Sequence, residues 1–233
     1  MPTITKMRVK KKAPSVKEPQ PPRWPYILLI SVTVASFLLL MILTYLDRIA
    51  PKDPLPETAP YTASEILNLN VPDFVTVDLI AVDGDSRSGE KLEAVRDIAI
   101  HYVANPGTSA KANRNYFDSP DSETSSHFIV GLEGEVLLCV PPDEKSSATN
   151  ERNRDTISVE VCHPDETGEF SSVTYESLVR LLAWLCDTYN LNEENLIRHY
   201  DVTGKLCPLY YVEHPEAWEK LKQDVKERIN AEI

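Results

Sequence analysis

The chain has 233 residues, 42% of them hydrophobic, and a formal net charge of -12 from 24 Lys+Arg and 36 Asp+Glu. Residues 1–48 contain 8 of the basic and 2 of the acidic residues, so residues 49–233 contain 16 basic and 34 acidic ones. The composition excludes a collagen-like or disordered chain, and so acidic a body excludes a nucleic-acid-binding protein, in which clustered Lys and Arg neutralise phosphates.

The first predicted element is a membrane span over residues 24–46, a run of 23 uncharged residues. A helix of this length rises roughly 35 Å, enough to cross the hydrocarbon core of a bilayer. The run has neither the polar face of a core helix nor the cleavage site of a signal peptide. Basic residues precede it and predict a cytoplasmic tail over 1–23. We therefore expect a single-pass protein of the cell membrane, with the rest of the chain extracellular.

Residues 47–72 predict an extracellular tether, because 5 prolines interrupt them and Pro-rich segments are extended, semi-rigid spacers. The remaining residues, 73–233, are numerous enough to form one compact core, and they contain no internal repeat. We therefore expect one globular domain beyond the membrane.

Alternating and β-branched runs predict the strands of this domain. In residues 156–162 the side chains alternate, so that Glu160 lies on the face opposite Ile157. Glu133 and Gly134 separate two such runs, which indicates a hairpin. The predicted strands cover residues 74–82, 97–100, 127–132, 135–140 and 156–162.

Two helices are predicted in the C-terminal half. Residues 174–189 carry an apolar stripe with the period of a helix, and Thr174 is the predicted N-cap. A second stripe begins at Pro215, a residue type that suits the first position of a helix. Strands interspersed with helices predict a mixed α/β (α+β) domain, in which helices flank a single central mixed β-sheet.

Residues 197–208 combine imidazole, thiol, carboxylate and ammonium groups in a loop-like segment. His and Cys are preferred ligands of zinc, and a catalytic zinc takes three protein ligands and keeps one position open. His199 and Cys207 would provide two ligands, and His101, at the end of a buried strand, is the candidate for the third. From residue types alone, a lone histidine is more often structural or at the surface, and a lone cysteine is more often a small buried hydrophobe.

The other cysteines fit that structural interpretation. Cys139, Cys162 and Cys186 fall in strand or helix patterns, and their spacing has no recognisable disulfide framework. A domain of this size does not need disulfides, so we expect mostly free thiols. A further interpretation makes Cys207 a nucleophile that His199 activates.

The segment HYDVTGKLCP, which begins at His199 and contains Cys207, resembles the closing motif of the zinc-dependent N-acetylmuramoyl-L-alanine amidases of type 2. Phage endolysins and peptidoglycan recognition proteins share the fold of this family. Three more blocks follow the family's order, so the resemblance covers about residues 74–225. These blocks are IAIHYVANPG (98–107), SSHFIVGLEGEVLLCVP (125–141) and DTISVEVC (155–162).

The resemblance implies roles for individual residues. It implies that His101, His199 and Cys207 bind Zn2+ and that Glu160 is the catalytic glutamate. Lys205 matches a lysine that helps to stabilise the oxyanion in the phage branch of the family.

Further residues are expected in or near the substrate cleft. Asp201 is a candidate partner for a ligating histidine or, equally, the cap of a turn. His127 matches a family histidine that is not a ligand, and we expect it to face the cleft. Asn105, in the block that contains the first ligand, is a further candidate for the cleft. His163 and His214 are expected at the surface.

The implied activity is hydrolysis of the amide bond between N-acetylmuramic acid and L-alanine in peptidoglycan, which lies outside the membrane. Two other interpretations stay open: a non-catalytic peptidoglycan-binding module of the same fold, and a zinc peptidase that cleaves within the stem peptide. Ser126 stands where phage enzymes often have a tyrosine, and residues 145–148 (KSSA) stand where many endolysins have A-W-H-A. No substrate contact is therefore transferred to these positions.

Overall fold

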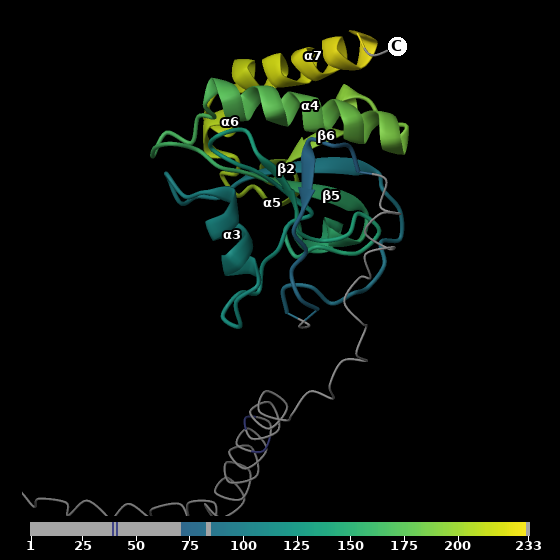
Figure 1. Cartoon of the computed structure of the whole chain (residues 1–233), viewed down its shortest axis with the longest axis vertical. Helices are drawn as coiled ribbons and strands as arrows, with labels where there is room; N and C mark the ends of the chain where they lie inside the picture. Colours follow the sequence, from purple (N-terminus) through teal and green to yellow (C-terminus); the bar gives the residue numbers. More distant parts are fainter. Residues whose placement is uncertain (1–38, 40, 42–70, 83–84, 232–233) are drawn as a thin grey trace, which may run out of the picture. The chain divides into compact units, whose positions relative to one another are not determined.

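The computed structural model describes residues 39, 41, 71–82 and 85–231 (Figure 1). The described residues 71–82 and 85–231 belong to one compact unit, and every strand and helix named below lies in it. The predicted tail 1–23, nearly all of the predicted span 24–46 and most of the predicted tether 47–72 lie outside the described residues. Within the part of the chain that is described, no helix has the length and apolar character needed to cross a membrane.

Six strands form a single mixed sheet in the order β1-β4-β3-β5-β2-β6, which confirms the predicted architecture of the domain. β3 and β4 pair antiparallel as the predicted hairpin, and the other neighbouring strands are parallel. The strands are β1 (Val75–Val77), β2 (Asp97–Tyr102), β3 (Phe128–Val130), β4 (Val136–Leu138), β5 (Thr156–Val161) and β6 (Leu196–Arg198).

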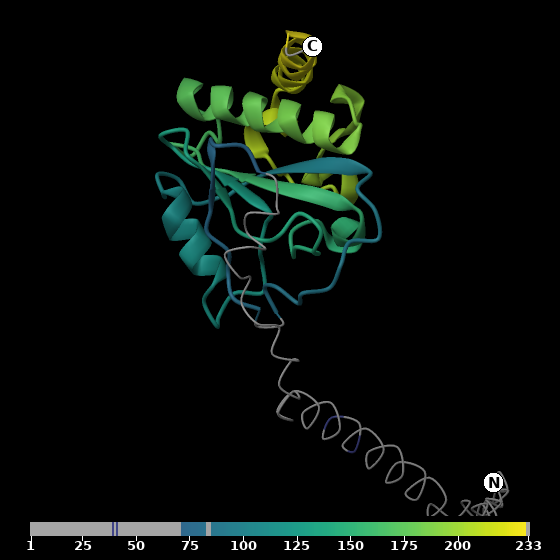
Figure 2. The ribbon, with the colours of Figure 1, turned by 45° about the vertical axis from the view of Figure 1, so that its right-hand side comes forward.

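Helices lie on both faces of this sheet (Figure 1 and Figure 2). α4 (Ser172–Tyr189) and α7 (Pro215–Ala231) pack against each other and bury the main apolar core with one face of the sheet. α3 (Ala110–Phe117) contacts β3 and β4 and closes a smaller apolar cluster. The short elements are α5 (His199–Thr203), α6 (Leu209–Glu213) and the 3-10 turns η1 (Asn150–Arg154) and η2 (Glu193–Asn195).

The alternation of β5 sorts its side chains between the two faces of the sheet, as predicted. Ile157, Val159 and Val161 belong to the main core that α4 and α7 cover. Glu160 therefore points to the opposite face. In the parallel pairing of β2 with β5, His101 is the direct partner of Glu160. The two side chains consequently share one face near the carboxyl ends of their strands.

The start of α4 differs from the prediction. The N-cap is Ser171, whose side chain accepts from the N–H of Thr174. Thr174 lies inside the first turn, fully buried, and its Oγ1 donates to the carbonyl of Gly131 at 2.9 Å. The predicted cap was wrong because Ser and Thr are both good N-caps, and only the contact with the β3–β4 hairpin distinguishes them.

Several elements were not predicted. α3 has few apolar residues, and β6 is too short to show a period. Residues 199–203 form the helix α5 rather than a loop, and Gly204, with φ at +77°, ends it in the left-handed conformation that glycine adopts without strain.

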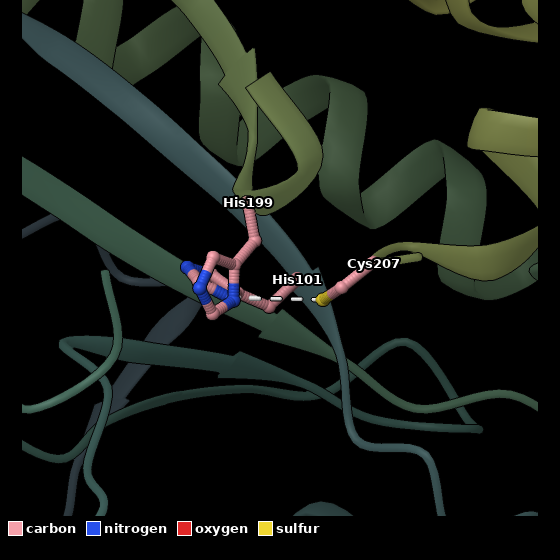
Figure 3. A group of neighbouring side chains, drawn as sticks. All are labelled: His101, His199 and Cys207. Atoms are coloured by element: carbon pink, nitrogen blue, oxygen red, sulfur yellow. Dashed lines mark hydrogen bonds between the residues drawn. The ribbon is translucent and has the colours of Figure 1, made fainter. Parts of the chain in front are cut away.

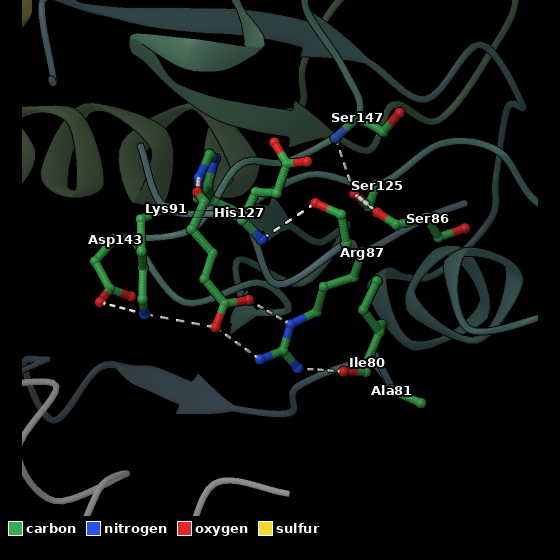
Figure 4. A network of polar contacts seen from close by, with 12 residues as sticks. Ile80, Ala81, Ser86, Arg87, Lys91, Ser125, His127, Asp143 and Ser147 are labelled. Carbon is green, nitrogen blue, oxygen red and sulfur yellow. Dashed lines mark hydrogen bonds and ion pairs between the residues drawn. The ribbon is translucent and has the colours of Figure 1, made fainter. Parts of the chain in front are cut away.

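A buried ion pair lies in the loops that precede β2 and β5 (Figure 4). Arg87 Nε donates to Glu144 Oε2 at 2.8 Å, and the exposed fractions of the two side chains are 4% and 5%. Arg87 Nη1 also donates to the carbonyl of Ile80 at 2.5 Å. His127 Nε2 donates to the carbonyl of Glu144 at 2.8 Å. The pair and His127 together thus join the segments before β2, before β3 and after β4.

Arg87→Met should lower the free energy of unfolding by about 3–5 kcal/mol, because the buried Glu144 carboxylate loses its guanidinium partner and keeps the longer contact to the exposed Lys91, whose Nζ lies at 3.8 Å. Urea unfolding of the full chain, followed by circular dichroism, measures this change. The double variant Arg87→Met/Glu144→Leu should lose less than the single one, since apolar groups then replace the whole pair. A single variant as stable as wild type would show that the pair does not hold these loops.

Candidate metal centre

Three residues that are distant in sequence converge at the carboxyl ends of β2 and β6. β2 pairs in parallel with β6, so His101 in β2 and His199, directly after β6, come to the same edge of the sheet. Cys207 returns to this edge, where its carbonyl accepts from the N–H of Tyr200 at 3.0 Å. The three side chains are buried, and their donor atoms all lie within 4.8 Å of one another (Figure 3).

The ring nitrogens of the two histidines have distinct surroundings. His101 Nδ1 lies 3.8 Å from Cys207 Sγ, and His199 Nδ1 is buried without any hydrogen-bond partner. The other ring nitrogen of each histidine, Nε2, contacts a polar side chain. His101 Nε2 lies 3.2 Å from Thr149 Oγ1, and His199 Nε2 lies 2.8 Å from Asn150 Oδ1. Each Nδ1 is thus left without an oxygen partner.

Burial sets the protonation of these groups. It lowers the pKa of His101 to about 3, helped by the charges of His199 and Lys205, and it also lowers the pKa of His199. Both imidazoles are therefore neutral at pH 7, the form that binds metals. Burial raises the pKa of the Cys207 thiol to about 12. A buried neutral thiol is a poor nucleophile, which argues against nucleophilic catalysis by Cys207.

These residues fit a divalent metal. A buried ring nitrogen without a partner is costly, and a cation in reach of its lone pair would satisfy it. A thiol that coordinates a metal releases its proton, so metal binding offsets the effect of burial on the pKa of Cys207. Two imidazole nitrogens and one sulfur form a donor set that suits Zn2+.

Glu160 lies beside this group. Its Oε2 is buried without a hydrogen-bond partner, and burial raises the pKa of the carboxyl to about 8 against the opposing effect of the Lys205 charge. Lys205 is exposed, and its charge also lowers the pKa of His101 and of His199. The two predicted catalytic residues therefore lie within electrostatic range of the three predicted ligands.

Other predicted residues lie elsewhere. Asp201 caps α5, because its carboxylate accepts from the N–H of Arg198 at 2.8 Å and from Arg198 Nη2 at 2.7 Å, so it is a cap and not a partner of a histidine. Asn105 is exposed in the loop after β2. His127, which we expected to face the cleft, is fully buried, and its Nδ1 accepts from the N–H of Ser158 at 2.9 Å.

His163 was also expected at the surface and is 1% exposed. Its ring packs on Tyr102, with 5.1 Å between the ring centroids, and its Nδ1 donates to the carbonyl of Asp165 at 2.7 Å. His214 is partly exposed and lies 3.3 Å from the Glu216 carboxylate. All four cysteines are free and buried, as expected.

Thr149 and Asn150 were not among the predicted site residues. They lie 48 and 49 positions from the histidines that they contact, and no local pattern marks them. Only the pairing of β2 with β5 and β6 brings their loop to the site.

The sequence profile of the N-acetylmuramoyl-L-alanine amidase family matches residues 91–209. N-acetylmuramoyl-L-alanine amidase CwlL of Bacillus licheniformis is 32% identical over an alignment of 155 positions, and the match covers 59% of this chain and 42% of that protein. N-acetylmuramoyl-L-alanine amidase BlyA of Bacillus subtilis (strain 168) is 29% identical over an alignment of 176 positions, and the match covers 66% of this chain and 47% of that protein. The chain thus spans less than half the length of these curated relatives.

A solved structure has the same fold. The catalytic domain of XlyA is 25% identical, with a TM-score of 0.56, and the match covers 65% of this chain and 98% of that chain.

Glu160→Gln should stabilise the full chain in the presence of a chelator, and more so at high pH. The folded-state pKa of about 8 lies above the ordinary value of 4.5, so Glu160 costs no stability below pH 4.5 and its full cost is present above pH 8. The difference in free energy of unfolding between variant and wild type should therefore grow between these values. Glu133→Gln, at an exposed carboxylate, controls for the change in net charge. A difference that does not vary with pH would contradict the burial of an unpaired carboxyl.

Proposed function

The chain belongs to the N-acetylmuramoyl-L-alanine amidase family, whose profile matches just over half of it, and from this premise we propose that residues 73–233 form a zinc-dependent hydrolase of peptidoglycan. The proposed reaction cleaves the amide bond between the lactyl group of N-acetylmuramic acid and L-alanine. The observation that carries the proposal is the convergence of His101, His199 and Cys207 beside the unpaired carboxyl of Glu160.

His101, His199 and Cys207 would hold the zinc ion, with each histidine using Nδ1. Bound zinc supplies Lewis acidity, which polarises a carbonyl and makes water easier to deprotonate. The three side chains come from β2, α5 and the loop after α5, so the fold itself sets the arrangement of the ligands. Their burial excludes bulk water from the ligand atoms.

Glu160 is the proposed proton carrier. Its Oε2 would accept a proton from the attacking water and then donate it to the nitrogen of the leaving L-alanine. Burial raises the pKa of this carboxyl, and a cation beside it opposes that effect, so the group is suited both to accept and to release a proton. Lys205 would place its ammonium near the oxyanion that forms on the scissile carbonyl.

We further propose that the protein is anchored in the cell membrane with the hydrolase domain facing the cell wall. The support is in the sequence: basic residues precede the uncharged run 24–46, and a Pro-rich segment follows it. A tether of this length would let the domain reach peptidoglycan some tens of ångströms from the membrane.

Glu160→Gln should lower turnover by roughly 10²–10⁴-fold with the zinc content unchanged, because the amide keeps the shape but cannot take the proton. His199→Ala should lose zinc and activity together, since the remaining ligands do not complete the set. Lys205→Ala should cost less than Glu160→Gln. Elemental analysis of the full chain gives the zinc content, and mass spectrometry of digested peptidoglycan gives turnover and the bond that is cleaved.

The products separate the alternatives. A free L-alanine amino group together with an intact stem peptide supports the amidase. Cleavage within the stem peptide would make the protein a zinc peptidase, and binding without cleavage would make it a recognition module. Stoichiometric zinc in His199→Ala would refute the ligand set, and near wild-type turnover in Glu160→Gln would refute the proton carrier.

Protease added to intact protoplasts should digest the hydrolase domain and leave the tail 1–23 protected, because positive residues stay on the cytoplasmic side of a span. Antibodies against each end of the chain detect the two parts after digestion. Permeabilised cells, in which both ends become accessible, are the control. Protection of the domain in intact protoplasts would overturn the proposed topology.

A further inference from the structure

The outer nitrogens of both candidate ligand histidines contact two consecutive residues. His101 Nε2 lies 3.2 Å from Thr149 Oγ1, and His199 Nε2 lies 2.8 Å from Asn150 Oδ1. Thr149 is fully buried, and Asn150 is the first residue of η1. One dipeptide, Thr149–Asn150, therefore meets both rings on the side away from Cys207.

The second of these contacts fixes the position of a proton. Asn150 Oδ1 only accepts, so His199 Nε2 must carry the hydrogen and donate it. His199 Nδ1 then keeps its lone pair, in a buried position where no other group donates to it. The opposite tautomer would place a buried N–H at Nδ1 with no acceptor, which is costly.

The backbone conformation of Asn150 and the hydrogen bonds of its turn also hold its side chain in place for this contact. Its φ is +54°, in the left-handed region, where Asn is the most tolerated residue after Gly. The amide oxygen of Asn153 accepts from the N–H groups of Ala148 and Thr149, at 3.1 and 2.6 Å. Arg152, in the same turn, pairs with Asp155 at 2.6 Å and with Asp97 at the start of β2. The dipeptide is thus fixed to the strand that carries His101.

We propose that Thr149–Asn150 is the positioning element of the metal centre: Asn150 takes the Nε2 hydrogen of His199, Thr149 orients the ring of His101 through its Nε2, and both Nδ1 atoms are left available to the metal. Neither residue is among the three candidate ligands. The inference rests on the proposed zinc site, and it adds which residues of this chain determine the tautomer and orientation of the ligands.

Three substitutions at Asn150 separate the side chain from the backbone. Asn150→Ala removes the acceptor and keeps the backbone strain, Asn150→Gly removes the acceptor and relieves the strain, and Asn150→Asp keeps an acceptor. Asn190, with the same φ of +54° at the end of α4, is the matched control because it lies outside the metal centre. Asn190→Ala thus reports the cost of the strained backbone alone.

The dissociation constant of zinc is measured on the full chain by competition with a chromophoric chelator. Asn150→Ala and Asn150→Gly should each weaken zinc binding by roughly 10–100-fold, the usual effect of losing a partner of a ligating histidine. Asn150→Asp should stay within a few-fold of wild type, and Asn190→Ala should not change. Circular dichroism verifies that each variant is folded. Wild-type affinity in Asn150→Gly, or an equal loss in all three Asn150 variants, would overturn the proposal.

A second measurement does not need the metal. The 15N chemical shifts of the His199 ring in the chelator-treated chain report which nitrogen carries the hydrogen. Nε2 should be protonated in wild type and in Asn150→Asp, and a mixture of tautomers should appear in Asn150→Ala. A hydrogen on Nδ1 in wild type would overturn the inference even if zinc binds. If wild type binds no zinc and still holds the hydrogen on Nε2, the proposed function fails while the role of Asn150 in setting the tautomer stands.

Discussion

The parallel pairing of β2 with β5 on one side and with β6 on the other is the constraint from which the site follows. Parallel strands present their carboxyl ends at one edge of a sheet, and in α/β folds ligands bind at such edges. Here that edge holds His101 at the end of β2, its direct partner Glu160 in β5, and His199 after β6. Cys207 needs only the short helix α5 to return to the same place.

Burial then gives these groups their chemistry. In water the two imidazoles, the thiol and the carboxyl would titrate near their ordinary values, but here burial lowers the pKa of each histidine and raises the pKa of Glu160 and of Cys207. Each shift favours the neutral form, and two of the buried atoms have no hydrogen-bond partner. Such a cluster is unfavourable for folding by itself, and a bound cation is the natural way to offset its cost.

Buried polar residues outside the metal centre connect the loops that lead to it. The Arg87–Glu144 pair and His127 link the segments before β2, before β3 and after β4, and the chain runs on from Glu144 to Thr149 and Asn150. Removing one member of a buried ion pair is strongly destabilising, because the other charge is left buried. Displacing the loop that contains Glu144 would break the pair in the same way, so the pair favours the observed position of this loop.

The amino-acid sequence by itself determined the elements that have a period and the residues that share a motif. The alternation of 156–162 placed Glu160 opposite the core, and the HYDVTGKLCP segment, with the blocks that precede it, singled out all three candidate ligands. Only the tertiary structure decided the rest: that His127 and His163 are buried, that Ser171 rather than Thr174 caps α4, and that Thr149 and Asn150 hold the histidines. The physical reason is that periodicity reports which face of an element is apolar, whereas a hydrogen bond across some fifty residues depends on strand order and register, which no local pattern encodes.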